Sequence, residues 1–222
     1  MDYDWDFSTV LANWRALASG AVMTILISLG SIVIGSVAGL AVGLCRSSSR
    51  PLLRAAAAVY VEVLLCIPIL VLLIWLYYCL PIVLGVAPSG PATAITALSL
   101  SLSAFFAEAV RGGLLSVPEG QYDAAAAVGL SRTQAYLHII LPQAFRVSLP
   151  AILTLYVSTI KLTSLASVIA VYELVHTGRG IVASTFRPLE VFTVLALFYV
   201  VILMPLMLLV RRVESLARWR LA

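Results

Sequence analysis

The sequence has little charge and almost no lysine. Of its 222 residues, 11% are charged and 62% are hydrophobic, whereas a soluble domain carries about 25% charged residues. With a mean hydropathy of +1.08, this composition excludes a water-soluble globule, a disordered tail and a nucleic-acid-binding protein. The single lysine, Lys161, follows Ile160 rather than a glycine, so the chain lacks the Gly-Lys pair of a Walker A phosphate loop.

Patterns for metal binding and disulfide formation are also missing. Cys45, Cys66 and Cys79 form no CxxC pair and lie in apolar runs, so we expect them to be small buried apolar residues. His138 and His176 are far apart and have no partner at metal-ligand spacing. We therefore expect no metal and no cofactor in this chain.

Five apolar runs are long enough to cross a bilayer, which takes about 20 helical residues. The segment before the first run carries Asp2, Asp4 and Asp6 ahead of its first arginine, which is unlike a signal peptide, so we expect that run to be retained. The sequence predicts an all-α integral membrane protein, with one transmembrane domain over residues 1–222. Its five predicted transmembrane helices cover residues 20–44, 53–80 (with Pro68 inside), 91–110, 147–171 and 191–210.

Arginine is distributed unequally between the segments that flank these runs. With five spans, one side of the membrane receives ten arginines and the other receives only Arg15, Arg179 and Arg187. Because cytoplasmic loops carry the excess of basic residues, we expect the N-terminus outside, the C-terminus in the cytoplasm and the connection over residues 111–146 on the cytoplasmic face. The ten are Arg46, Arg50, Arg54, Arg111, Arg132, Arg146, Arg211, Arg212, Arg218 and Arg220.

Two patterns concern packing inside the membrane. Gly35, Gly39 and Gly43 form a doubled GxxxG on one helix face, which is either a seam for another helix or subunit or simply the high glycine content of membrane helices. Glu108 and Arg111 are three residues apart and are expected to pair on one helix face.

The connection over residues 111–146 carries helix signals of its own. Pro118 and Glu119 mark a helix start, Gln121–Val128 form a short helix, and Gly129 ends it. Ser131 is expected to cap a second helix that runs to Leu141, with Pro142 interrupting the chain before the fourth span. Two readings remain open: the helices form a compact knob for a soluble partner, or they lie on the lipid headgroups. In the first reading the polar contacts come from Glu119, Gln121, Asp123 and Arg132.

The same connection resembles the "EAA" loop of bacterial ABC importer permeases. The matching pattern is Asp123-Ala124-Ala125, three residues, Gly129, nine residues, Ile139, one residue and Leu141-Pro142, with Asp in place of the usual Glu. Further stretches resemble the polar amino-acid uptake branch, which imports histidine, arginine and glutamine. They are Glu62, Pro68–Leu70, Tyr77–Pro81, Glu108–Gly113, Ser116–Pro118, Gly120-Gln121, Leu141–Ala144 and Lys161–Leu165.

This resemblance implies a type I ABC importer permease (MetI-like) fold in the bacterial inner membrane. It also implies these partners: an ABC ATPase dimer that binds ATP and Mg, a second permease subunit (the same or a related chain), an extracytoplasmic solute-binding protein and membrane lipid. It assigns coupling to the ATPase to Glu119, Gln121, Asp123, Ala124, Ala125, Gly129, Arg132 and Pro142.

The resemblance also points to a substrate pathway, in which this chain departs from its relatives. Leu162 and Tyr172 stand where cationic amino-acid members carry acidic residues, so we expect a neutral substrate that stacks on Tyr172, Phe105 or Phe106. Alternatively, a partner permease supplies the pocket. The candidate pathway residues are Glu62, Ser101, Phe105, Lys161, Leu162, Thr163, Ser164 and Tyr172.

We therefore expect a non-enzymatic transport subunit of an importer for an amino acid or a similar solute. The alternative within this class is a permease for an opine or another non-standard amine. A passive channel or a membrane enzyme is the alternative from a different class. Ser158 and Lys161 have the SxxK spacing of some hydrolases, but no supporting motif accompanies them.

Overall fold

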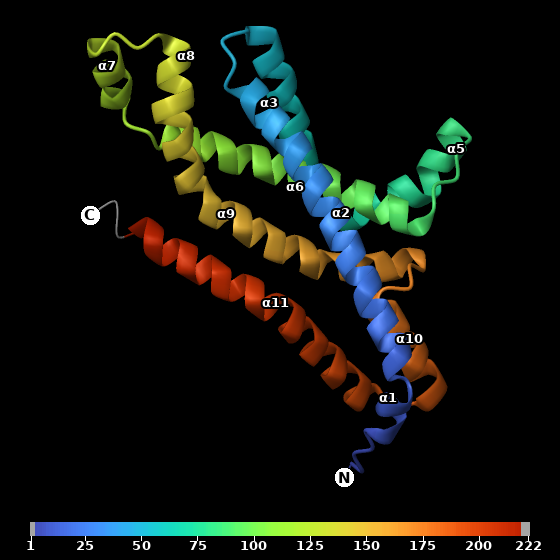
Figure 1. Cartoon of the computed structure of the whole chain (residues 1–222). Helices are drawn as coiled ribbons and strands as arrows, with labels where there is room; N and C mark the ends of the chain where they lie inside the picture. The colour runs from blue at the N-terminus through green and yellow to red at the C-terminus, as the bar shows by residue number, and fades with distance from the viewer. Residues whose placement is uncertain (1–2, 219–222) are drawn as a thin grey trace. The chain divides into compact units, whose positions relative to one another are not determined.

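All regular secondary structure in the described part of the chain is helical. A computed structural model (Figure 1) describes the backbone of residues 3–218 and side chains as far as residue 215, and no strand occurs in that range. Asp2 and Arg220 lie outside the described residues, as does the side chain of Arg218. The helices are α1 (Ser8–Ala12), α2 (Trp14–Arg46), α3 (Pro51–Cys66), α4 (Ile69–Ile74), α5 (Leu80–Leu84), α6 (Gly90–Leu115), α7 (Glu119–Ala127), α8 (Arg132–Ala135), α9 (Leu141–Leu162), α10 (Leu174–Thr185) and α11 (Pro188–Arg218).

Four helical stretches are long and apolar enough to cross a membrane, and they become five if the pair Pro51–Cys66 and Ile69–Leu84 counts as one span. The second predicted run is therefore not one continuous helix. It breaks before Pro68 because proline lacks an N–H and disfavours helical geometry in the residue before it. The other four stretches are Trp14–Arg46, Gly90–Leu115, Arg132–Ile169 and Pro188–Ser215.

Two π-helical turns each come directly before a Leu-Pro pair. They are Trp75–Cys79 before Pro81 and Tyr136–Ile140 before Pro142, and in the second the N–H of Leu141 donates to the carbonyl of Tyr136, five residues back. The widened turn accommodates a ring that would otherwise meet the carbonyl of the preceding turn. The prediction that Pro142 interrupts the chain is therefore wrong, since Arg132–Ile169 forms one helical stretch.

The chain divides into two compact units. The first comprises the residues up to Ile34, Ile67–Ser99 and Val157–Leu206. Its core joins the start of α2 to α10 and α11 through Leu17, Leu174 and Leu195. Helix α10, which the sequence analysis did not predict, is capped at its start by Glu173, whose buried carboxylate accepts hydrogen bonds from two backbone N–H groups.

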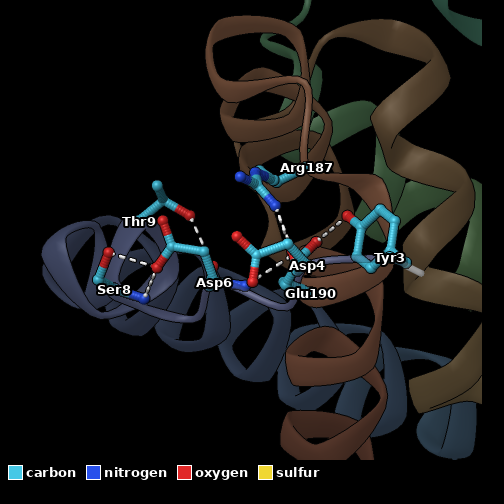
Figure 2. Close-up of polar contacts among 7 residues, drawn as sticks. All are labelled: Tyr3, Asp4, Asp6, Ser8, Thr9, Arg187 and Glu190. Carbon is cyan, nitrogen blue, oxygen red and sulfur yellow. Dashed lines mark hydrogen bonds and ion pairs between the residues drawn. The ribbon is translucent and has the colours of Figure 1, made fainter.

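The N-terminal segment is tied to the start of α11 (Figure 2). The Tyr3 hydroxyl and the Asp6 N–H donate to the two carboxylate oxygens of Glu190, over 2.6 and 3.0 Å. Arg187 donates through Nη1 to the carbonyl of Asp4 over 2.5 Å. Asp6 in turn accepts hydrogen bonds from the side chain and the N–H of Ser8, which lower the pKa of the Asp6 carboxyl.

The second unit comprises Gly35–Cys66, Leu100–Tyr156 and the residues from Met207. In it the doubled GxxxG of α2 lies against α6. A Cβ at Gly39 would be 2.6 Å from the Cβ of Phe106, and Cβ atoms at Gly35 and Gly43 would meet Leu102 and Val110. The predicted helix seam is therefore confirmed, and its partner is α6 of the same chain.

The prediction that the cysteines are buried is wrong. Cys66 is exposed and Cys45 and Cys79 are half-buried. A transmembrane helix can turn apolar side chains toward lipid, so an apolar run does not by itself predict burial against protein.

Candidate functional site: the α7–α8 hairpin

Helix α7 ends in a glycine-dependent cap. Gly129 has φ of +78°, in the left-handed region that favours glycine. The N–H of Leu130 donates to Ala125 over 3.1 Å and the N–H of Gly129 donates to Ala126 over 3.0 Å. This pair of bonds is a Schellman motif. It closes α7 and turns the chain directly into α8 (Figure 1), so the predicted helix end at Gly129 is confirmed.

Helix α8 begins with a capping box. The Ser131 side chain accepts a hydrogen bond from the N–H of Gln134, and the Gln134 side chain accepts one from the N–H of Ser131. This reciprocal pair satisfies two donors that a helix start leaves without partners. The predicted cap at Ser131 is confirmed.

A small buried cluster fixes the base of the hairpin. Val117, Ile140 and Ala144 are buried together, with Tyr136 packed against them. Ala125, in the middle of α7, is 1% exposed. Gln143 donates to Gln121 over 3.3 Å, which links the start of α9 to α7. The hairpin is thus held by contacts of its own unit.

Six of the eight predicted coupling residues are exposed, whereas Gln121 is half-buried and Ala125 is buried. Small exposed side chains let another surface approach closely, and the charged ones offer it polar contacts. The two inner residues hold the hairpin in shape. The exposed six are Glu119, Asp123, Ala124, Gly129, Arg132 and Pro142.

Three of the predicted pathway residues lie in the second unit. Glu62 and Phe105 are exposed and Ser101 is half-buried. Phe106, a predicted stacking surface, is 7% exposed and packs with Val110 and Ile152. The prediction for Phe106 is wrong, because this ring fills the core beside the glycine seam.

The other pathway residues lie in the first unit, where α9 passes into a 3₁₀ helix over Thr163–Ile169. Lys161, a candidate pathway residue, is exposed in this unit. Thr163 and Ser164 donate their hydroxyls to the carbonyls of Ile160 and Lys161, over 2.7 and 2.8 Å. Both hydroxyls are therefore used within the helix, and Leu162 is half-buried beside them.

Tyr172 lies at a hollow of about 1090 Å³ in the same unit. It is 73% exposed, and its ring meets that of His176 edge to face at 4.7 Å. Its neighbour Glu173 is fully buried and accepts hydrogen bonds from the N–H groups of Val175 and His176. Burial raises the pKa of the Glu173 carboxyl.

An arginine–glutamate–arginine cluster lies near the hairpin in the second unit. Glu108 accepts from Arg111 through Nε and Nη2, over 3.0 and 2.9 Å, which confirms the predicted pair. Its other carboxylate oxygen contacts Arg46 at the end of α2. The sequence analysis did not predict the contact between Arg46 and Glu108, because a sequence does not show which residues of two different transmembrane helices lie at the same height. Among the described residues, no group of three metal-ligating side chains occurs.

Comparisons with known proteins agree on one kind of protein. Residues 31–219 match the family described as binding-protein-dependent transport system inner membrane component. The chain is 36% identical to the glutamine transport system permease protein GlnP of Escherichia coli (strain K12), over 96% of this chain and 97% of that protein. It is 36% identical to the L-cystine transport system permease protein TcyB of Bacillus subtilis (strain 168), over 90% and 85% of the two chains. The crystal structure of an amino acid ABC transporter with histidines contains a similar chain, with a TM-score of 0.89, 28% identity and coverage of 96% and 99%.

Proposed function

Because the chain belongs to the family of binding-protein-dependent transport system inner membrane components, we propose that its α7–α8 hairpin couples its transmembrane helices to a separate ATPase. The chain is the permease subunit of an amino-acid ABC importer and lies in the inner membrane. It has the MetI-like type I permease fold.

The exposed face of the hairpin is the observation that carries the proposal. Asp123, Ala124 and Gly129 are exposed, and the hairpin behind them is fixed by a Schellman motif, a capping box and a buried base. A rigid knob transmits a displacement to the helices at its base, here α6 and α9. ATP binding would favour one state of the membrane helices and hydrolysis the other, which requires only different affinities for two conformations.

The proposed assembly has this chain, a second permease subunit (the same or a related chain), two ATPase subunits that bind ATP and Mg, and an extracytoplasmic solute-binding protein. The N-terminus lies outside and the C-terminus in the cytoplasm, so the hairpin faces the ATPase. The arginine excess on the hairpin side supports this orientation.

Affinity purification tests the coupling role. The tagged chain is isolated in mild detergent from its native membrane, and the accompanying proteins are identified by mass spectrometry. We expect an ABC ATPase, with zero or one second permease. Gly129→Ala should reduce the recovered ATPase about tenfold, since an L-residue in left-handed geometry costs about 1–2 kcal/mol.

The chain offers a matched control for that variant. Gly85 follows α5 and has a φ of +66°. A Cβ added at Gly85 or at Gly129 would meet no atom within 4 Å. Gly85→Ala therefore introduces the same backbone strain in a residue that is not part of the hairpin, and it should recover the ATPase normally. Equal recovery from both variants would contradict the docking role.

The proposed substrate is a neutral amino acid. Over residues 157–185 the only carboxylate is that of Glu173, and it is buried and bonded to two backbone N–H groups. This segment therefore has no acidic group to pair with a cationic side chain, and desolvating such a side chain without a partner is costly. The names of the relatives above, for glutamine and for L-cystine, fit a neutral ligand.

Substitution at Leu162 tests this choice. Leu162→Asp should raise uptake of arginine or lysine relative to glutamine in proteoliposomes that contain the complete transporter. Leu162→Asn is the control, because it adds similar polarity without charge. An unchanged preference in Leu162→Asp would count against a pocket at this position and favour one supplied by the partner permease.

A further inference from the structure

A second hollow, of about 810 Å³, lies in the second unit beside the α7–α8 hairpin. It is lined by residues from the end of α2, the start of α3 and the end of α6, together with two tyrosines of the hairpin region. Three of its lining residues are arginines and none is acidic. The lining residues include Arg46, Arg54, Arg111, Leu115, Tyr122 and Tyr136.

The charge around this hollow is not balanced by protein groups. Glu108 is shared between Arg46 and Arg111, so one carboxylate faces two guanidinium groups. Glu62 lies 4.0 Å from Arg46, but its side chain is 70% exposed. Among the ion pairs of the described residues none involves Arg54, which is exposed. Even if Glu62 is counted, the three arginines leave an excess of one positive charge.

Two of the arginines lie at or near the ends of helices long and apolar enough to cross a membrane, where lipid phosphates are expected. Arg46 is the last residue of the apolar helix α2, and Arg111 lies four residues before the end of α6. The remaining wall is apolar, with Leu114, Leu115 and two alanines of α3. A guanidinium group binds phosphate oxygens in a bidentate manner. An apolar wall next to such groups suits the glycerol and upper acyl chain of a lipid.

We propose that this hollow binds the phosphate group of an anionic membrane lipid. The bound headgroup then lies against Tyr122 of α7 and Tyr136 at the base of the hairpin, so the lipid contacts the element proposed to couple the ATPase. An acidic protein segment fits less well, because it would place polar backbone against the leucine wall.

Lipid retention by the purified transporter tests this site. The intact complex is transferred to nanodiscs of phosphatidylcholine with or without phosphatidylglycerol, and bound lipid is measured by native mass spectrometry. Arg54→Gln removes a guanidinium group from the hollow. Arg50→Gln removes an equal charge from an exposed residue four positions away that does not line it, so it reports the general attraction of the membrane surface.

We expect Arg50→Gln to weaken phosphatidylglycerol retention at most about fivefold, as for one surface charge near an anionic membrane. Arg54→Gln should weaken retention about tenfold further, because a charge-assisted hydrogen bond is lost as well. Both variants should keep the subunit composition of the wild type.

Three results would overturn the proposal. Equal losses in the two variants would show surface attraction without a site. If inorganic phosphate added to phosphatidylcholine nanodiscs displaced no lipid and bound in an Arg54-dependent manner, the ligand would be a soluble phosphate. Loss of the ATPase from Arg54→Gln alone would show that a protein partner occupies the hollow.

Discussion

The hydroxyl of Tyr3 donates a hydrogen bond of 2.6 Å to the carboxylate of Glu190, 187 positions away in the sequence (Figure 2). Glu190 is fully buried and also accepts from the N–H of Asp6 and, at 3.4 Å, from Arg187. A buried carboxylate needs such donors, because desolvating its charge is otherwise costly. The N-terminal segment therefore supplies two of the groups that make Glu190 tolerable at the start of α11.

Tyr3→Phe should loosen the N-terminal segment without unfolding the first unit. The ring remains, but Glu190 loses one donor, so the N–H of Asp6 should exchange with solvent faster. Hydrogen exchange followed by mass spectrometry of the N-terminal peptide measures this. Tyr78→Phe is the control, since Tyr78 is 54% exposed and lies in another part of the unit; unchanged exchange in Tyr3→Phe would contradict a role for this hydrogen bond.

Gly39→Ala should destabilise the second unit. The new Cβ would lie 2.6 Å from the Cβ of Phe106 and 2.8 Å from the carbonyl of Ser103. Overpacking of this kind costs about 1–3 kcal/mol, which outweighs the gain of about 1 kcal/mol in helix propensity. Thermal unfolding in detergent should show a lower midpoint.

The control for Gly39→Ala is Gly112→Ala in α6. A Cβ at Gly112 would meet no atom within 4 Å, so only the gain in helix propensity remains and the midpoint should stay or rise. Similar behaviour of the two variants would mean that α2 and α6 do not pack closely at Gly39.

Local signals in the sequence predicted local structure well. Gly129 and Ser131 are caps whose chemistry depends on a few neighbouring residues, and both were predicted correctly. The Glu108–Arg111 pair was predicted because both residues lie on one helix turn. The doubled GxxxG predicted a seam, but its pattern does not say which helix fills it.

The errors came from features that depend on distant or alternative geometry. Pro142 reads as a helix break, yet a π turn ahead of it keeps the helix continuous. Apolar character predicted buried cysteines, although hydropathy does not distinguish a side chain that faces lipid from one that faces protein. Phe106 was expected to stack on a substrate, but its aromatic character does not say whether the ring faces a pathway or the core. Helix α10 was missed because its 12 residues are too few and too polar to resemble a span.

Glu108→Gln should destabilise the second unit by about 1–2 kcal/mol. The amide oxygen still accepts one hydrogen bond, but the negative charge between the guanidinium groups of Arg46 and Arg111 is lost. Water screens their repulsion poorly, because the Arg46 side chain is only 15% exposed. Thermal unfolding should show this, with a larger loss at low salt. Glu62→Gln is the matched control because the Glu62 side chain is 70% exposed and an exposed ion pair contributes at most about 1 kcal/mol. Equal unfolding midpoints for Glu108→Gln and Glu62→Gln would show that the arginine–glutamate–arginine cluster does not stabilise the unit.

Ser131→Ala should weaken the coupling of ATP hydrolysis to transport, although the hairpin should still form. The variant loses the hydrogen bond from the N–H of Gln134 to the Ser131 hydroxyl and the bond that this hydroxyl donates to the Gln134 side chain, which costs the start of α8 about 1 kcal/mol. The backbone N–H of residue 131 keeps its bond to the Gln134 side chain. Faster exchange of the α8 amide hydrogens is expected, together with less transport per ATP hydrolysed in proteoliposomes. Thr133→Ala is the control, because Thr133 is an exposed position of the same helix outside the capping box. If Ser131→Ala loosened α8 and left transport per ATP unchanged, rigidity of the hairpin would not be what transmits the motion, and coupling would have to depend on the exposed contacts of α7 alone.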